Sequence, residues 1–547
     1  MSEARGATSE RQGVAVAGTV LRVGLGALLL LVIVALPNDW GRLLSWPQKA
    51  IPLEWLAILG LLLILPRPAA RVARAIVVAV TGALLFVKIA DMGTGTAFAR
   101  PFNPILDLHF FVSGWHLLSG TVGVGRAVAA IALALLVFLA TLFALAWGLR
   151  GLERLPRGSR RAPGLALLLL AAFGAVLVQS GGPSFANAQA TRFAVERAEI
   201  LARGFRDLAE FETALGQDPA EALLGPGLLQ RLEGKDVLFL FVESYGRSAV
   251  EDPRYRDAAR ERLSAVEAGL AGAGFSARSG WLTAPTVGGQ SWLAHAALLS
   301  GLWTDKQQRY ERLMVSERPS LNRIFRRAGW RTIGVMPAIT MDWPEARWYG
   351  YDATYVRANL GYRGDPFNWV TMPDQFTLKA MQRLELDREG RAPVMAEVSL
   401  ISSHAPWTPI PPVLPWADIG DGTVFNPHAH SGDPPEIVWR DHERVRDQYA
   451  LSIDYALETI GSYIETFGTR DLVLVVLGDH QPASIVTGPD ASWDVPVHLI
   501  AADQDVLAAI DGWNWTPGMI PAADVPATGM DAFRERFLRA FSASPLG

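Results

Sequence analysis

The sequence of 547 residues contains no cysteine. This absence excludes disulfide bonds, thiolate metal ligands and a cysteine nucleophile. It does not decide the cellular compartment, because an exported protein can do without disulfides. A basic excess is also missing, since 50 Lys and Arg stand against 54 Asp and Glu and the net charge is -4. Nucleic acid is therefore not an expected partner.

Charged residues are scarce in this chain. They make up 19% of the sequence, whereas hydrophobic residues make up 50%. This composition is rich in apolar residues for a soluble enzyme, and it predicts that part of the chain lies in lipid. A chain of this length has room for both a membrane region and a complete α/β domain.

The apolar residues concentrate in five segments near the amino terminus. They lie at about residues 15–37, 51–66, 71–90, 124–148 and 163–180. Most are close to the roughly 20 residues that a spanning helix needs, and the second is shorter. One such segment could be a buried core helix, but five in succession predict a transmembrane domain of five helices over residues 1–182. No small-residue cleavage site follows the first segment, so we expect an anchor rather than a cleaved signal peptide.

Arginine residues in the loops between these segments predict the orientation. Arg67, Arg71 and Arg74 lie at the junction of the second and third segments, and five arginines lie between the fourth and fifth. Short loops rich in Arg or Lys stay in the cytoplasm. The chain after about residue 181 is then expected outside the cytoplasmic (inner) membrane of a multi-pass protein. Residues 183–234 have the composition of a helical connector, and residues 235–547 form the expected extracytoplasmic catalytic domain.

Two apolar runs in this outer region each end in an acidic residue. Residues 237–242 precede Glu243, and residues 472–477 lead through a glycine to Asp479 and His480. Such runs are typical of strands buried on both faces of a parallel sheet. Strand and helix patterns alternate between them, which predicts a doubly wound α/β domain with a mostly parallel central sheet. Ligands bind at the carboxyl ends of such strands, so these side chains form a candidate divalent-metal site.

A serine at a predicted helix start is the next element. Ser291 follows Gly288 and Gly289 and opens an apolar helix. Backbone amides and the dipole at a helix N-terminus favour a phosphate or sulfate. A serine alone is a poor nucleophile at neutral pH, but a divalent metal bound to its oxygen would lower its pKa. The alternative for Ser291 is a plain N-cap without catalytic function.

A histidine follows another predicted strand. His404 lies directly after residues 398–401 and the serine pair 402–403. It could bind a phosphoryl oxygen of a substrate or protonate a leaving alkoxide. The alternative is that His404 is a loop histidine with satisfied hydrogen bonds and no role in the reaction.

The combination of these motifs resembles the alkaline phosphatase superfamily. Phe-Val-Glu-Ser at 241–244, a hydroxyl residue opening a helix that ends in Leu-Leu-Ser-Gly at 298–301, Ser-His-Ala-Pro at 403–406 and Gly-Asp-His at 478–480 follow the membrane segments. Within the superfamily the chain looks like the membrane-anchored branch of lipoteichoic acid synthases, osmoregulated-glucan phosphoglycerol transferases and lipid A phosphoethanolamine transferases. The resemblance covers residues 235–540 and, more loosely, the anchor.

This resemblance implies one divalent cation held by Glu243, Ser291, Asp479 and His480. Mn²⁺ is expected first, with Zn²⁺ or Mg²⁺ as alternatives that ligand type does not separate. The resemblance also implies a covalent phospho-enzyme on the hydroxyl, with His404 close to the substrate.

The implied reaction transfers the head group of a membrane phospholipid donor to a glycan or lipid acceptor. Phosphoglycerol is expected first and phosphoethanolamine second, because the phosphoethanolamine enzymes usually carry disulfides that this chain cannot form. The alternatives are a membrane-bound phosphodiesterase or phosphatase, a sulfuric-ester hydrolase of the same superfamily, and a non-catalytic membrane sensor. No protein partner is expected.

The nucleophile departs from the family pattern. Many members use threonine, and Thr286 is available; Ser291 lies ten residues before Gly301, the spacing of sulfatase-type motifs. Ser291 is preferred, and Thr286 stays open. The formylglycine signature Cys/Ser-x-Pro-x-Arg is missing, because Leu293 and His295 occupy its last two fixed positions. Sulfate-ester hydrolysis through formylglycine is therefore not expected. His295, one turn beyond Ser291, either contacts the substrate phosphate or packs in the core.

Three further residues carry weaker hypotheses. In lipoteichoic acid synthases, a region resembling residues 342–352 contributes head-group contacts. Arg347 could clamp a phosphate and Trp343 could cover a glycerol, or the loop could be an exposed aromatic segment beside the membrane. His498 either supports the metal strand or is a core residue.

Overall fold

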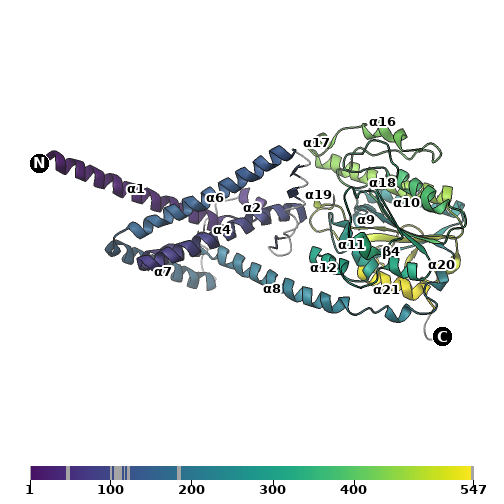
Figure 1. Ribbon diagram of the computed structural model, residues 1–547, viewed down its shortest axis with the longest axis horizontal. Coiled ribbons are helices and arrows are strands. Elements are labelled where there is room, and N and C mark those ends of the chain that lie inside the picture. The colour runs from purple at the N-terminus through teal and green to yellow at the C-terminus, as the bar shows by residue number, and fades with distance from the viewer. Residues whose placement is uncertain are drawn as a thin grey trace. The chain divides into compact units, whose positions relative to one another are not determined.

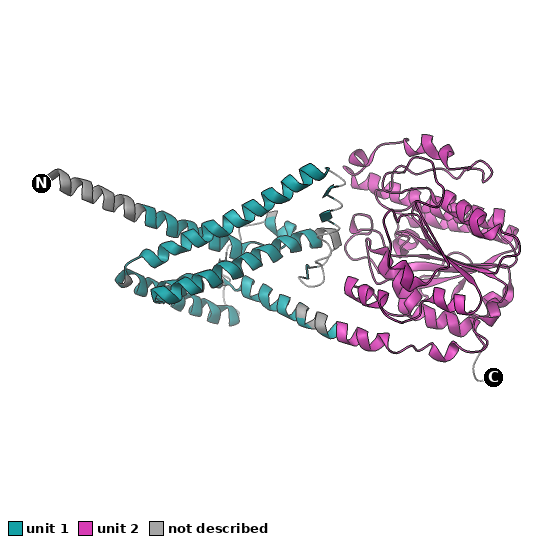
Figure 2. Ribbon diagram, viewed as in Figure 1, with its two compact units in different colours: residues 1–207 teal, residues 208–547 magenta. Residues whose placement is uncertain are grey.

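The computed structural model describes residues 2–44, 50–98, 101–103, 114–115, 118–119, 123–180 and 186–543 (Figure 1). The chain forms two compact units, Met1–Asp207 and Leu208–Gly547 (Figure 2). The division falls within one helix, α8 (Gln189–Leu215). Each unit has a hydrophobic core of its own. The expected boundary at residues 182–183 lies outside the described residues.

The first unit is helical, and its helices coincide with the five predicted apolar segments. They are α1 (Ser2–Ala35), α3 (Leu53–Ile64), α4 (Arg67–Phe98), α6 (Val124–Arg154) and α7 (Arg157–Gln179), with the short α2 (Trp40–Leu44) after α1. Among the described residues, four of these helices are long and apolar enough to cross a membrane, and α3 with 12 residues is not. At about 1.5 Å per residue, α3 covers roughly 18 Å of a ~30 Å hydrocarbon layer. Four membrane-crossing helices are thus supported, and the predicted fifth is not confirmed.

Glycines allow the helices of this unit to approach closely. A Cβ atom on Gly26 of α1 would lie 2.6 Å from the carbonyl carbon of Gly148 of α6. A Cβ on Gly60 of α3 would lie 2.9 Å from the carbonyl oxygen of Gly164 of α7. Small residues at contacts between apolar helices are typical of membrane bundles, where van der Waals packing replaces the hydrophobic effect.

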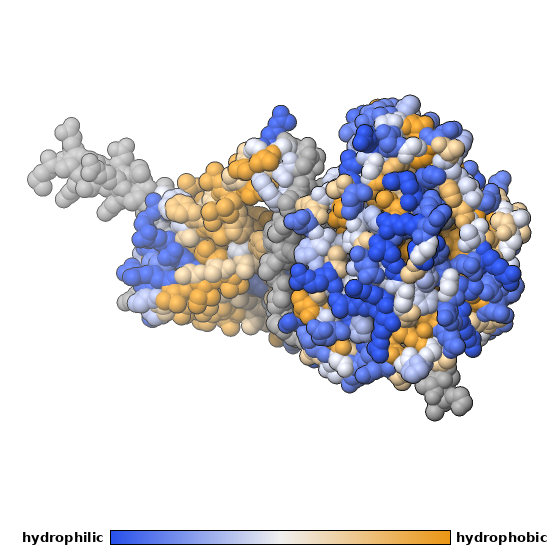
Figure 3. Space-filling view, turned by 45° about the vertical axis from the view of Figure 1, so that its right-hand side comes forward, coloured by the Kyte–Doolittle hydropathy of each residue, from blue (hydrophilic) through white to orange (hydrophobic). Residues whose placement is uncertain are grey.

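The surface of the first unit also fits a lipid environment. Phe143 is 72% exposed, Leu136 64% and Phe173 61%. Figure 3 shows hydrophobic surface over the helices of this unit. Large exposed apolar surfaces of this kind are unusual for a water-exposed helix bundle, so we interpret this unit as a membrane anchor.

The second unit is built on one sheet of nine strands. They are β3 (Asp236–Val242), β4 (Ser276–Thr283), β5 (Arg331–Met336), β6 (Ala353–Val356), β7 (Val394–Leu400), β8 (Leu472–Gly478), β9 (Asp494–Ala501), β10 (Thr516–Pro517) and β11 (Thr528–Gly529). Their order is β10-β4-β9-β8-β3-β7-β5-β6, and β11 pairs with β4. The remaining two described strands, β1 (Ile51–Pro52) and β2 (Ala186–Asn187), pair in the first unit.

The sheet is mixed, with both parallel and antiparallel pairs of strands. Strands β8, β3, β7, β5 and β6 run parallel to one another. Strand β9 runs antiparallel to both β8 and β4. Only the four-residue helix α19 (Ser484–Thr487) lies between β8 and β9. Residues 479–493 therefore lack a long helix of the kind that usually carries the chain across a sheet between parallel strands. The α/β class is confirmed, and the parallel sheet is confirmed only in part.

Helices cover both faces of this sheet. They are α9 (Arg247–Glu251), α10 (Arg256–Gly272), α11 (Ser291–Ser300), α12 (Gln307–Met314), α13 (Leu321–Arg327), α14 (Ala346–Tyr349), α15 (Asp374–Met381), α16 (Asn426–Ala429), α17 (Pro435–Val438), α18 (His442–Phe467), α20 (Gln504–Ala508) and α21 (Met530–Phe541), besides α19. Side chains of β3 alternate between two cores: Leu238 and Leu240 pack with α10 and α18, while Phe239 and Phe241 pack with α11, α13 and α21. Both faces are therefore buried, as the unbroken apolar strands predict.

A buried charge cluster holds the start of the second unit against its core. Asp218 accepts hydrogen bonds from both terminal nitrogens of Arg534 at 2.9 and 2.8 Å. Arg318 Nη2 lies 3.4 Å from the same carboxylate, and both arginine side chains are 1% exposed. Burial raises the pKa of Asp218, but the two guanidinium groups outweigh burial and hold this pKa below its ordinary value. Asp218 is thus the shared anion of two buried cations.

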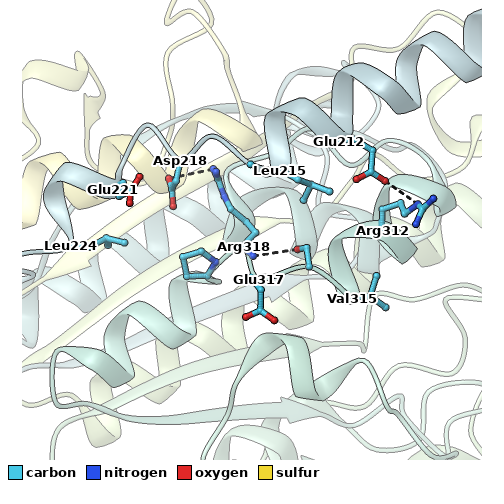
Figure 4. A pocket seen from close by; sticks show the side chains of 12 residues that line it. Glu212, Leu215, Asp218, Glu221, Leu224, Arg312, Val315, Glu317 and Arg318 are labelled. Carbon is cyan, nitrogen blue, oxygen red and sulfur yellow. Dashed lines mark hydrogen bonds and ion pairs between the residues drawn. The ribbon is translucent and has the colours of Figure 1, made fainter.

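The same cluster borders a groove of about 530 Å³ (Figure 4). The groove lies between the end of α8 and the segment after α12. Its two arginines are paired within the protein, Arg318 with Asp218 and Arg312 with Glu212 at 3.0 Å. We therefore assign the groove no ligand.

Replacing Asp218 with asparagine is expected to lower the free energy of unfolding by about 3 kcal/mol, because two buried guanidinium groups lose their anion. The folded-state pKa lies below the unfolded value. The stabilisation is therefore present above the unfolded pKa and is lost as the pH falls through the folded pKa. In thermal unfolding of the full-length protein in detergent, Asp218→Asn should unfold at a lower temperature than the wild type at neutral pH. The two unfolding temperatures should converge in acid. The matched change Asp257→Asn, at a side chain 88% exposed, should have no effect, and equal losses for both variants would contradict this role.

Candidate active site

The two acidic residues at predicted strand ends lie side by side. Strands β3 and β8 are parallel neighbours, and Val242 is paired with Gly478. Glu243 and Asp479 therefore leave the sheet together at its carboxyl edge. The backbone N–H of Ser244 donates to Asp479 Oδ1 at 2.8 Å, which joins the two strand ends directly.

Glu243, Asp479 and His480 converge on one point. One ligand atom from each lies within 4.8 Å of the others. His480 Nε2 is 3.3 Å from Glu243 Oε1 and 3.6 Å from Asp479 Oδ2. Their side chains are 10%, 2% and 1% exposed for Glu243, Asp479 and His480. Carboxylate oxygens and an imidazole nitrogen are donors that Mn²⁺ and Zn²⁺ accept.

Hydrogen bonds occupy one polar atom of the Asp479 side chain and one of the His480 ring. The other polar atom of each is left to bind a cation. Asp479 Oδ1 accepts the backbone N–H groups of Ser244 at 2.8 Å and His480 at 2.7 Å, so Oδ2 remains for a cation. His480 Nδ1 lies 2.8 Å from the carbonyl oxygen of Gln481. A carbonyl only accepts, so Nδ1 carries a proton and Nε2 is the ligand atom. The residues present therefore fit a divalent cation.

The electrostatics of the cluster also fit a cation. Burial raises the pKa of Asp479 to about 6, and the Glu243 carboxylate adds to this shift. Burial lowers the pKa of His480, but Asp479 and Glu243 outweigh burial and raise it to about 9. Burial likewise raises the pKa of Glu243, while the charges of His404 and His480 outweigh burial and hold it below its ordinary value. Without a metal, a proton on His480 thus offsets part of the carboxylate charge.

The hydroxyl of Ser291 belongs to this cluster. Ser291 Oγ donates to Glu243 Oε2 at 3.0 Å and lies 3.3 Å from His480 Nε2. Ser291 is the first residue of α11, and it is half-buried while the other three are buried. Its Oγ atom is therefore placed both to join a bound cation and to meet a substrate from solvent.

Three sharp turns of the backbone position the site residues. Ser244, Gln290 and Trp407 have positive φ angles of 58°, 65° and 58°. They follow Glu243, precede Ser291 and end the turn that carries His404. Residues other than glycine avoid this conformation at a cost of about 1–3 kcal/mol, and such residues cluster at functional sites. Serine, glutamine and tryptophan gave no sequence signal for these turns.

Thr286, the alternative nucleophile, has a different environment. Its Oγ1 atom donates to the carbonyl oxygen of Gly289 at 2.7 Å, and the residue is 7% exposed. Among the described residues, Thr286 makes no hydrogen bond to Glu243, Asp479 or His480. The structure thus brings Ser291 to the cluster and uses Thr286 to close the loop before it.

His404 borders the cluster on an exposed loop. Its Nδ1 atom lies 2.5 Å from the carbonyl oxygen of Ala405. The neighbouring Ser403 Oγ donates to the Glu243 carbonyl at 2.6 Å and ties this loop to the end of β3. The ring of His404 is near enough for its charge to lower the pKa of Glu243. His404 is therefore close to the cluster and open to solvent.

His295 is packed inside the unit, one turn beyond Ser291. Its Nδ1 atom lies 2.7 Å from Glu397 Oε1, and its ring stacks on Phe241 with centroids 3.7 Å apart. His295 is 6% exposed, and its charge lowers the pKa of Asp479. Sequence reasoning missed Glu397, because it is a single acidic residue within an apolar strand pattern.

Among the described residues, the remaining predicted residues make no hydrogen bond to Glu243, Asp479 or His480. Half-buried Trp343 packs against Tyr349 and Tyr351, with ring centroids 5.4 and 6.1 Å apart. The side chain of Arg347 is exposed. His498 is fully buried between Ser279 Oγ at 2.7 Å and the Tyr245 hydroxyl at 3.2 Å, and burial lowers its pKa to about 3. His498 is therefore a neutral core residue.

Comparison with known proteins finds similarity in solved structures. No protein-family model and no curated protein matches the chain. A lipoteichoic acid synthase of Listeria monocytogenes is 14% identical with a TM-score of 0.38, over 58% of this chain and 75% of that one. The C-terminal periplasmic domain of EptC from Escherichia coli, in complex with Zn, is 15% identical with a TM-score of 0.38, over 57% and 83%.

A phosphoglycerol transferase of Streptococcus pyogenes, in complex with sn-glycerol-1-phosphate, is also similar. It is 13% identical with a TM-score of 0.37, over 61% of this chain and 83% of that one. A protein of Vibrio parahaemolyticus described as belonging to the alkaline phosphatase superfamily is 13% identical with a TM-score of 0.32, over 53% of this chain and 70% of that one.

Proposed function

We propose that this protein is a membrane-anchored, metal-dependent enzyme that transfers the head group of a phospholipid through a covalent phospho-enzyme on Ser291. One observation carries the proposal. The Ser291 hydroxyl lies 3.0 Å from Glu243 Oε2 and 3.3 Å from His480 Nε2, inside a buried group of metal-ligand type. A plain helix N-cap has no need of that environment.

The proposed metal site consists of Glu243, Ser291, Asp479 and His480. A divalent cation held there, with Mn²⁺ first and Zn²⁺ or Mg²⁺ as alternatives, would lower the pKa of the serine hydroxyl and offset charge on the phosphoryl oxygens. The chain itself supplies the orientation. Hydrogen bonds fix the free ligand atoms of Asp479 and His480, and the first turn of α11 offers backbone amides to the phosphate.

The proposed reaction consists of two successive nucleophilic displacements at phosphorus. The deprotonated Ser291 Oγ attacks the lipid phosphodiester, and the bond to diacylglycerol breaks while His404 gives a proton to the leaving alkoxide. An acceptor hydroxyl of a glycan or lipid next attacks the phosphoserine, His404 takes the proton of that hydroxyl, and the bond to Ser291 breaks, which regenerates the Ser291 alkoxide. Water in place of this acceptor would make the enzyme a phosphodiesterase.

The donor proposed first is phosphatidylglycerol, and phosphatidylethanolamine is second. His295, Arg347 and Trp343 are the proposed contacts to the phosphate and the head group. We place residues 1–182 in the cytoplasmic membrane, residues 183–234 as a connector, and residues 235–547 on the extracytoplasmic side, where such lipids and acceptors meet.

Mass spectrometry of the full-length protein tests this proposal. After incubation with Mn²⁺ and phosphatidylglycerol, the peptide that contains Ser291 is expected to gain the mass of phosphoglycerol, and phosphatidylethanolamine should give less adduct. Release of free head group without an acceptor would favour the hydrolase. If neither lipid modifies the metal-loaded protein, the proposed function is wrong.

A further inference from the structure

A buried carboxylate that the proposed reaction does not use lies behind the nucleophile helix. Glu397 on β7 is 0% exposed. Its Oε1 atom is 2.7 Å from His295 Nδ1. Its Oε2 atom accepts hydrogen bonds from Asn322 Nδ2 at 2.9 Å and from the Tyr351 hydroxyl at 2.6 Å. Among the described residues, no lysine or arginine pairs with Glu397. A carboxylate buried in this way costs several kcal/mol, which an apolar side chain would avoid.

Neighbouring residues are shaped to accommodate this carboxylate. Glu397 is paired across the sheet with Gly334 of β5. A Cβ atom on Gly334 would lie 2.7 Å from Cζ of the Tyr351 ring. Glycine therefore leaves the space in which Tyr351 reaches Glu397. A side chain that only filled the core would not need this gap and three donors.

The network restrains His295 on two sides. Glu397 accepts the Nδ1–H group, and Phe241 covers one face of the ring at a centroid distance of 3.7 Å and an angle of 17°. Among the described residues, Nε2 has no hydrogen-bond partner. The charge of the ring acts on Asp479, one of the proposed metal ligands. His295 is also one helical turn beyond Ser291, on roughly the same face of α11.

We propose that Glu397 is a positioning residue that fixes the orientation of the His295 ring through its Nδ1–H group, so that the Nε2–H group of the doubly protonated ring donates a hydrogen bond to the phosphoryl group transferred to Ser291. This inference rests on the proposed function. Asn322 and Tyr351 hold the carboxylate in turn, as outer hydrogen bonds orient histidines in other polar sites. Glu397 acts through His295 and does not itself touch the substrate.

The rate of phosphoserine formation in a single turnover tests this role. Glu397→Ala is expected to slow it about 10–100-fold, the usual effect of removing an orienting partner. Glu397→Gln keeps the shape and one acceptor oxygen and should lose less. His295→Ala should slow the step as much as Glu397→Ala, and the double variant should be no slower than His295→Ala alone, because both changes remove one contact.

Two measurements that do not depend on turnover separate positioning from structure. Bound Mn²⁺ should stay at the wild-type level in both Glu397 variants, while the affinity for inorganic phosphate should fall about 10-fold. Glu385→Ala is the matched control. Glu385 is also 0% exposed and is bound by Arg331 and Tyr355, but it is not joined to the nucleophile helix. The Glu385→Ala substitution should lower thermal stability and leave the rate of phosphoserine formation unchanged.

The outcomes distinguish the two proposals. If the wild-type protein forms no phosphoserine, the proposed function and this inference both fail. If the wild type reacts and the Glu397 variants react equally fast, or if they lose Mn²⁺, the positioning role alone is overturned. A rate loss shared by Glu385→Ala would likewise reduce Glu397 to a structural residue.

Discussion

Replacing Ser291 with alanine is expected to abolish the covalent phospho-enzyme and to reduce head-group transfer by about 10⁴-fold or more, as for other covalent nucleophiles. Alanine lacks the oxygen that bonds to phosphorus, and no other described hydroxyl lies within hydrogen-bond distance of both Glu243 and His480. Intact-mass analysis after incubation with Mn²⁺ and phosphatidylglycerol measures the adduct. Glu243, Asp479 and His480 remain in this variant, so it should fold and retain weaker metal binding.

Thr286→Ala is the matched comparison for the nucleophile. Its hydroxyl donates to the Gly289 carbonyl, so its loss should cost about 1 kcal/mol of loop stability and change the rate only a few-fold. The reverse pattern, with an adduct that survives in Ser291→Ala and disappears in Thr286→Ala, would make Thr286 the nucleophile. The chemistry would then stand, and the assignment of Ser291 would be wrong.

Loss of the divalent cation is the second large effect that we expect. Replacing His480 with alanine should remove most bound metal and slow phosphoserine formation by about 10³-fold, since a metal ion contributes several kcal/mol to such a transition state. The variant leaves Glu243 and Asp479 close together without the imidazole between them. Chelation of the wild-type protein should have the same effect, and added Mn²⁺ should restore the wild type only.

Elemental analysis of the purified proteins measures the bound metal and so tests this prediction directly. His430→Ala is a suitable control, because His430 is 71% exposed and pairs with Asp365 at the surface. It should keep both metal and activity. Wild-type metal content in His480→Ala would show that the cation is held elsewhere.

Local sequence patterns predicted many of the elements, and their limits have physical causes. All five apolar segments are helices, but the second is bounded by Pro52 and Pro66, which keep α3 too short to span a membrane. The strands before Glu243 and Asp479 could be identified because unbroken apolar runs record burial on both faces. The direction of β9 could not be predicted, because β9 is as apolar as the parallel strands of the sheet and its direction depends on how residues 479–493 return the chain to the sheet.

By itself, the sequence determined the apolar membrane segments, the two acidic strand ends and the serine at a helix start, since each is a pattern within a few neighbouring residues. Only the tertiary structure decided which side chains meet. It paired β3 with β8 across more than 200 residues of chain, brought Ser291 rather than Thr286 to the ligand cluster, and placed Glu397 behind His295. Such contacts depend on strand order and helix packing, which bring together residues whose local sequence carries no trace of one another.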